Sequence, residues 1–149
     1  MNGYDFTLYL LSFYVHTYLH ASFFIKSSCF ASWKLIGKEL KDAVIAGHDG
    51  NVWAKSQDFN VTPSEIQTIM NNFGNQDSLA SSGFHLGGTK YFYLSGDDDV
   101  IRGKQGKGGV HCVKTNQTLL VGVYDAPMEP GTAATITEKL GDYLKGVGY

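Results

Sequence analysis

The sequence has few cysteines, few prolines and little net charge. Two cysteines in 149 residues, Cys29 and Cys112, lie far apart and form no CxxC motif; this excludes a disulfide framework and favours a reducing compartment. Three prolines against 18 glycines favour many tight turns over a disordered chain. Because the formal net charge is −2, the chain has no overall attraction for nucleic acid or an anionic membrane, and any basic binding site must be a local patch.

Charged residues are also absent between Phe6 and Ile25. About twenty apolar residues can span a bilayer, but His, Thr and Ser residues interrupt this run, and no Lys or Arg precedes it as in a signal peptide. Residues 1–33 are therefore interpreted as an atypical apolar extension, which is an artefact, an alternative start or a membrane anchor. The balanced remainder predicts one domain over residues 34–149, a length that suits a single core.

The remainder predicts an antiparallel sheet made of hairpins, with helices packed on both faces. Three hairpins are expected where a glycine-rich or polar turn separates two apolar runs; the turns lie at residues 47–51, 87–88 and 115–117. The continuous apolar run Leu119–Tyr124 is typical of a strand covered on both faces. The expected fold class is therefore α+β, an α/β sandwich.

Two helices have clear sequence signals, and a third, short one is expected over residues 34–41. Thr62-Pro63-Ser64-Glu65 contains a capping box with Pro at the first helical position. Apolar residues then follow at i, i+3, i+4 and i+7 from Ile66 to Phe73, which predicts a helix that stops near Gly74. The segment from Pro130 to Gly146 repeats apolar residues at helical spacing and predicts the longest helix.

Motifs for catalysis or metal binding are weak. His85 and His111 lie in strand patterns, where half-exposed sheet residues are expected, since catalysis would need an oriented partner. The glycine-rich segment 103–109 lacks the GxxxxGK[ST] spacing of a phosphate loop. The run Asp97-Asp98-Asp99 lacks the spaced oxygen ligands of an EF-hand and predicts a polar turn. We therefore expect no catalytic residue, metal or cofactor.

Basic residues gather in one part of the predicted sheet. Arg102, Lys104 and Lys107 are close in sequence, and Lys90 lies on a neighbouring hairpin. Together they could form one basic patch, although an ordinary solvated face has the same composition.

Three aromatic residues form a second candidate group. Trp53 ends the first hairpin, and Tyr143 and Tyr149 lie on and just after the last helix. Core packing is the usual role of such residues, but Tyr149 ends the chain, where burial is least expected. Exposed Trp and Tyr rings side by side can dock a polyproline II helix, which is already extended and loses little entropy on binding.

Four segments resemble the profilin family, in uninterrupted order over about Leu35 to Tyr149. Each segment alone is modest, but four in register are highly specific, and the third is most similar to plant and fungal forms. The segments are AGHDGNVWA at residues 46–54, LGGTKY at 86–91, VIRGK with Gly108-Gly109 at 100–109, and EKLGDYL at 138–144.

The resemblance implies a cytoplasmic, cytoskeletal protein that is not an enzyme. It would bind monomeric actin, regulate actin polymerisation and dock proline-rich proteins such as formins. The implied actin-binding residues are Lys90, Arg102, Lys104, Glu129 and Gly131. The implied residues of the groove for proline-rich peptides are Trp53, Tyr143 and Tyr149. Lys104 and Lys107 would be candidates for binding phosphoinositide headgroups.

The N-terminus departs from the family pattern. Profilins usually open with Met-Ser-Trp and a helix whose end resembles Leu35-Ile36-Gly37, but Trp33 lies too close to that end to match the family Trp. Because the residues before Lys34 replace this helix, we expect weaker binding of proline-rich ligands. Two alternatives stay open: a membrane-anchored variant, and a small-molecule-sensing or scaffold domain of similar layered fold with an apolar internal pocket.

Overall fold

The computed structural model describes residues 40–149, in which seven strands form one antiparallel sheet of order β2-β1-β7-β6-β5-β4-β3. The extension 1–33 and almost all of the short helix expected at 34–41 lie outside these residues. The strands are β1 (Asp42–Gly47), β2 (Val52–Lys55), β3 (Phe84–Leu86), β4 (Thr89–Gly96), β5 (Val100–Gln105), β6 (Gly108–Lys114) and β7 (Thr118–Tyr124). The helices are α3 (Pro63–Asn71), α4 (Asp77–Ser82) and α5 (Pro130–Gly146).

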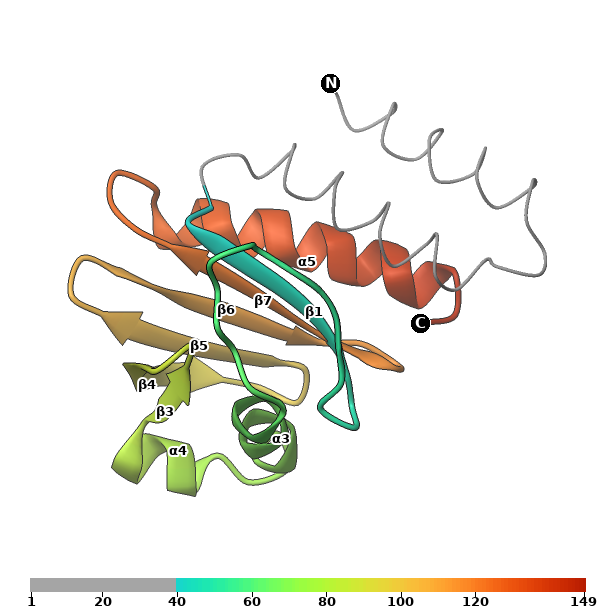
Figure 1. The fold of residues 1–149 in the computed structure, drawn as a ribbon, viewed down its shortest axis with the longest axis horizontal. Coiled ribbons are helices and arrows are strands. Elements are labelled where there is room, and N and C mark those ends of the chain that lie inside the picture. The colour runs from blue at the N-terminus through green and yellow to red at the C-terminus, as the bar shows by residue number, and fades with distance from the viewer. Residues whose placement is uncertain (1–39) are drawn as a thin grey trace.

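Helices lie on both sides of the sheet, as the sequence predicted (Figure 1). The long helix α5 packs on β6 and β7, whereas α3 contacts β3 and α4 contacts β4. Because successive side chains of a strand point to opposite faces, β1 contributes to two apolar clusters. Ala43 and Ile45 pack in the cluster that includes Leu140 of α5, and Val44 packs with Ile66 of α3 in the other.

The three expected hairpins are present. In the first, Ile45 of β1 pairs with Ala54 of β2, and Gly50 has φ of 90°, a conformation that glycine adopts without steric cost. The second joins β3 and β4, and the third joins β6 and β7. Strand β7 is buried along its whole length, as its continuous apolar run predicted.

Helix α3 begins at the predicted capping box. The Thr62 hydroxyl accepts a hydrogen bond from Glu65 N (3.2 Å), and the Glu65 carboxylate accepts one from Thr62 N (2.9 Å). The helix ends at Asn71, slightly before the predicted stop at Gly74, yet Phe73 beyond its end is still buried. The following helix α4 was not predicted.

Within residues 40–149, no helix is both long enough and apolar enough to cross a bilayer. The uncharged run at residues 6–25 lies outside this part of the chain.

Candidate functional site

The solvent-facing side of β4 and β5 combines cations with exposed apolar side chains. Phe92 is 64% exposed and Leu94 is 55% exposed, since α5 packs on β6 and β7 and does not extend over these outer strands. Phe92 lies opposite Lys104 in the antiparallel register, and Lys90 Nζ lies 5.7 Å from the centre of the Phe92 ring. We refer to the surface formed by Lys90, Phe92, Leu94, Arg102 and Lys104 as the β4–β5 face.

Arg102 of this face is connected to α5 through a carboxylate. Its guanidinium lies 3.8 Å from the Glu138 carboxylate, which also accepts a hydrogen bond of 2.9 Å from His111 Nε2. His111 is only 3% exposed, which corrects the expectation of a half-exposed sheet residue: α5 covers β6 at this point. Burial lowers the pKa of His111, although the bond to the Glu138 carboxylate opposes this effect.

The start of α5 lies at the same end of the sheet as the turn between β5 and β6 (Figure 1). Lys104 pairs with Gly109, which in turn pairs with Tyr124 at the end of β7, six residues before α5 begins. At that start, Glu129 is exposed and its side chain makes no capping hydrogen bond, and Gly131 is exposed as well. The predicted actin-binding residues thus fall on the β4–β5 face and the nearby start of α5.

Lys107 lies just beyond the end of β5, three residues after Lys104. It is exposed in the turn between β5 and β6, where Gly106 has φ of 59°. This segment is a tight strand-to-strand turn, as expected, rather than a phosphate loop that leads into a helix.

Two of the three predicted aromatic residues are in ring contact, and the third packs on the same apolar cluster. The Trp53 and Tyr149 rings meet edge to face, with centroids 6.0 Å apart and planes at 86°. Tyr143 packs with both of them against the cluster under α5. All three residues are half-buried. We refer to Trp53, Tyr143 and Tyr149 as the ring surface.

The last residue of the chain is held in place by backbone hydrogen bonds. Tyr149 N donates to Leu144 O (2.8 Å), and Asn116 N donates to Tyr149 O (3.1 Å). In addition, the Gln117 side chain donates to Gly148 O (3.0 Å). These bonds fix the Tyr149 ring beside Trp53 and explain why it is more buried than a chain terminus usually is.

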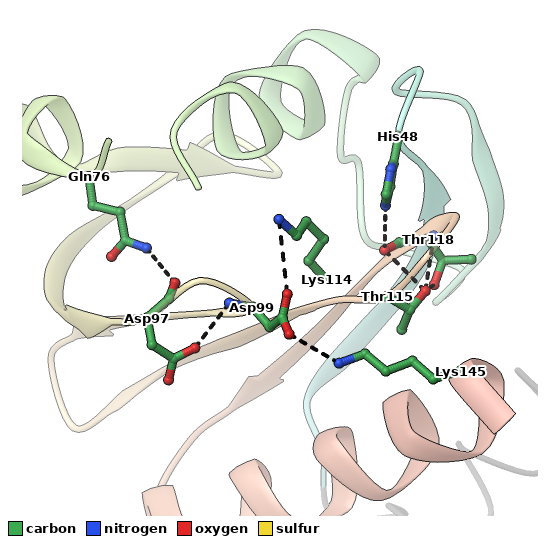
Figure 2. Close-up of polar contacts among 8 residues, drawn as sticks. All are labelled: His48, Gln76, Asp97, Asp99, Lys114, Thr115, Thr118 and Lys145. Atoms are coloured by element: carbon green, nitrogen blue, oxygen red, sulfur yellow. Dashed lines mark hydrogen bonds and ion pairs between the residues drawn. The ribbon is translucent and has the colours of Figure 1, made fainter. Parts of the chain in front are cut away.

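The acidic turn before β5 is occupied with internal contacts (Figure 2). Asp97 accepts a hydrogen bond from Asp99 N (3.0 Å), and the Asp99 carboxylate lies 3.2 Å from Lys145 Nζ and 4.0 Å from Lys114 Nζ. Within the described part of the chain, no group of His, Cys, Asp and Glu residues is arranged to hold a metal ion. The turn therefore ties β5 to β6 and α5.

Nucleophilic chemistry also finds no support among residues 40–149. Cys112 is fully buried, and burial raises the pKa of its thiol, which disfavours the reactive thiolate. His48 donates to Thr118 O (3.2 Å), and His85 is exposed on β3.

Sequence reasoning missed Phe92 and Leu94. The apolar segment from Tyr91 to Leu94 was interpreted only as a strand. The alternation of side chains along this strand did contain a signal for an exposed Phe92. Lys90 and Phe92 fall on the face opposite Tyr91, and Tyr91 is buried. What it could not show is that, among residues 40–149, no helix covers the side of β4 that carries Phe92 and Leu94.

Comparison with known proteins gives a consistent result. The profilin family model matches residues 30–149. Profilin of Drosophila melanogaster is 51% identical over 107 residues, which cover 72% of this chain and 85% of that protein. Profilin of Bombyx mori is 50% identical with the same coverage. The structure of Acanthamoeba castellanii profilin IB aligns with a TM-score of 0.76 and 44% identity, covering 80% of this chain and 95% of the other.

Proposed function

Since the chain belongs to the profilin family, we propose that it regulates actin polymerisation by binding monomeric actin on one surface and proline-rich peptides on another. As a family member it is a binding protein, not an enzyme. Two solved relatives support the two ligands: one structure is a complex of LokiProfilin1 with rabbit actin, and another holds mouse profilin IIa with a double repeat from the FH1 domain of mDia1. At 16% and 21% identity, these two share the fold with this chain.

The observation that carries the actin proposal is the composition of the β4–β5 face. Exposed Phe92 and Leu94 lie among Lys90, Arg102 and Lys104, and apolar residues ringed by polar ones are typical of a protein interface. The cations would steer an acidic partner surface toward this face. Glu129 and Gly131 would extend the contact to the start of α5.

The actin proposal is tested by removing two cations of the face. We expect Arg102→Ala with Lys104→Ala to weaken binding to monomeric actin by about tenfold or more and to reduce its salt dependence. Lys55→Ala is the matched control, because Lys55 is exposed on β2 at the opposite edge of the sheet. Titration of labelled actin at two salt concentrations measures both effects. Unchanged binding by the double variant would show that this face is not the actin surface.

The ring surface supports the proposal for proline-rich peptides such as those of formins. Trp53 and Tyr149 are in edge contact, and Tyr143 packs on the same cluster, so aromatic surfaces lie side by side, as the docking of a polyproline II helix requires. The residues before Lys34 lack the pattern of the usual first helix, and we propose that this departure weakens peptide affinity. A polyproline peptide titrated against this chain and against a version with a family-like first helix tests the idea. Equal affinity would refute it.

Three finer assignments belong to the same proposal. Lys104 and Lys107 would bind phosphoinositide headgroups; vesicles with and without phosphatidylinositol 4,5-bisphosphate, tested against Lys107→Ala, measure that contribution. The protein would act in the cytoplasm on the actin cytoskeleton. Residues 1–33 would be an extension ahead of a plant- or fungal-like profilin domain at 34–149. Mass spectrometry of the mature N-terminus tests whether the extension is kept.

A further inference from the structure

One oxygen of the Glu138 carboxylate contacts two residues at the edge of the β4–β5 face. It accepts the hydrogen bond of 2.9 Å from His111 Nε2 and lies 3.8 Å from Arg102 Nη2. His111 on β6 and Arg102 on β5 are direct cross-strand partners, so their side chains lie on the same face of the sheet. Glu138 therefore connects α5 both to the buried part of β6 and to the exposed face beside it.

The two contacts of this carboxylate differ in exposure and in strength. The His111 side chain is 3% exposed and makes a hydrogen bond of ordinary length. The Arg102 side chain is 37% exposed and makes only a long ion pair with Glu138, while its Nη1 lies 3.5 Å from Ser95 Oγ on β4. The buried bond thus fixes the carboxylate, whereas Arg102 can leave it readily, since exposed ion pairs contribute little to stability.

Charged groups act on the His111 ring from several elements. Glu138 faces it from α5, Arg102 from the paired strand β5, and Asp97 from the turn between β4 and β5. On the other side its partner is Gly122 of β7, which has no side chain. Burial and the positive charge of Arg102 lower the pKa of His111, and the two carboxylates only partly oppose them. The ring is therefore neutral at neutral pH and gains a proton in mildly acidic solution.

We propose that Glu138 partly neutralises Arg102 and that protonation of His111 releases Arg102, so that the β4–β5 face binds its acidic partner more tightly in mildly acidic solution. This inference rests on the proposed binding of actin at that face. While His111 is neutral, the full negative charge of the carboxylate attracts Arg102. A protonated ring forms a charge-assisted bond, about twice as strong as a neutral one, and balances that charge itself. Arg102, now also repelled by the imidazolium, turns toward Ser95 and the partner.

A purely structural role of Glu138 predicts the opposite result. If the residue serves only to tie α5 to β6, its loss should leave actin affinity unchanged or lower it. Loss of a neutralising charge should instead raise the affinity for an acidic surface, and only while Arg102 is present.

The first test is titration of labelled actin with the full chain at pH 7.5. Glu138→Gln keeps the shape of the side chain and removes its charge, and we expect it to tighten binding about two- to fivefold, the range typical of an exposed ion pair. In an Arg102→Gln background, the same change should lose most of this effect. Asp77→Asn is the matched control, because it removes one negative charge at an exposed residue of α4, on the other side of the sheet.

The second test follows the proton by NMR. We expect the Arg102 Nε–H signal to shift with the same midpoint as the His111 ring resonances, and this shift to vanish in His111→Gln. Actin affinity should rise as the pH falls through that midpoint, relative to His111→Gln at the same pH, so that titration of actin itself cancels. If His111→Gln does not fold, Glu138→Gln takes its place, since that side chain is 42% exposed. The rise should be lost there as well, because Arg102 is already released.

The proposed surface and this inference fail in different ways. If Arg102→Ala with Lys104→Ala binds actin like the original chain, the surface is wrong and the inference falls with it. If the double variant weakens binding but Glu138→Gln does not tighten it, the surface stands and the inference alone is wrong. Equal tightening by Asp77→Asn, equal tightening in the Arg102→Gln background, or an Arg102 signal that does not follow His111 would also overturn the inference.

Discussion

At the scale of single residues, His111 makes the stability of the fold depend on pH. Its folded-state pKa is lowered, first of all by burial, so the unfolded chain binds the proton more readily. Neutral His111 therefore makes its full contribution to the free energy of unfolding above the unfolded-state pKa of about 6.5. That contribution is lost as the pH falls from there through the folded-state pKa. The loss has a slope of at most about 1.4 kcal/mol per pH unit for one proton.

Urea unfolding at pH 7.5 and pH 5 checks this prediction. His111→Gln should lose less stability than the original chain over that interval, because it has no proton to take up. His85→Gln should behave like the original chain, since His85 is exposed on β3. The same pH dependence in all three proteins would contradict the assignment to His111.

Phe92 is the residue on the β4–β5 face where truncation should affect binding most. It is 64% exposed and pairs with Lys104, and exposed aromatic residues at an interface centre often contribute more than 1 kcal/mol. We expect Phe92→Ala to weaken actin binding about tenfold with little change in unfolding. Val147→Ala is the control, because Val147 is also an exposed apolar residue but lies at the end of α5. Equal actin affinity of the two variants would exclude Phe92 from the interface.

At the scale of elements, the start of α3 also fixes the turn between β3 and β4. Besides capping the helix, the Glu65 carboxylate accepts hydrogen bonds from Gly87 N (3.1 Å) and Gly88 N (3.2 Å). Thr62→Ala should cost about 1 kcal/mol of unfolding free energy, the usual value for a lost cap. Glu65→Ala should cost about twice as much, since it leaves the turn amides without their partner as well.

Urea unfolding of the two variants measures the difference, with Ser64→Ala as the control within the same turn of helix. Ser64 is exposed, and its change should have almost no effect. A smaller cost for Glu65→Ala than for Thr62→Ala would show that the bonds to the turn add no stability.

Elements were predictable where local signals agree, and uncertain where tertiary contacts decide. The start of α3 and the first hairpin follow from capping chemistry and from Asp49-Gly50. Helix α4 has only six residues, no side-chain cap and one buried residue, Leu79, so packing rather than sequence pattern holds it. The burial of His111 and the exposure of Phe92 depend on where α5 lies across the sheet, which strand patterns do not specify.

The candidate binding surfaces were likewise predictable only in part. The cations and rings were proposed from the resemblance to profilins, and the fold places Trp53 and Tyr149 in ring contact with Tyr143 on the same apolar cluster.

At the scale of the whole molecule, α5 separates the two proposed binding surfaces. Glu129 precedes its first residue, whereas Tyr143 and Tyr149 lie at its other end. A helix of 17 residues is about 25 Å long at 1.5 Å per residue. Both surfaces are thus far enough apart for two ligands to bind at once.

We therefore expect actin and a proline-rich peptide to bind independently. Saturating polyproline should change the actin dissociation constant by less than about twofold, because sites without shared contacts are close to additive. Trp53→Ala should abolish the peptide's binding and leave actin affinity unchanged, while the Arg102 and Lys104 double variant should do the reverse. Actin titrations with and without peptide, on the original chain and the two variants, measure these affinities. If the peptide instead changes actin affinity fivefold or more, the two sites must be coupled along α5. If that effect of the peptide is absent in Trp53→Ala, the coupling begins at the ring surface.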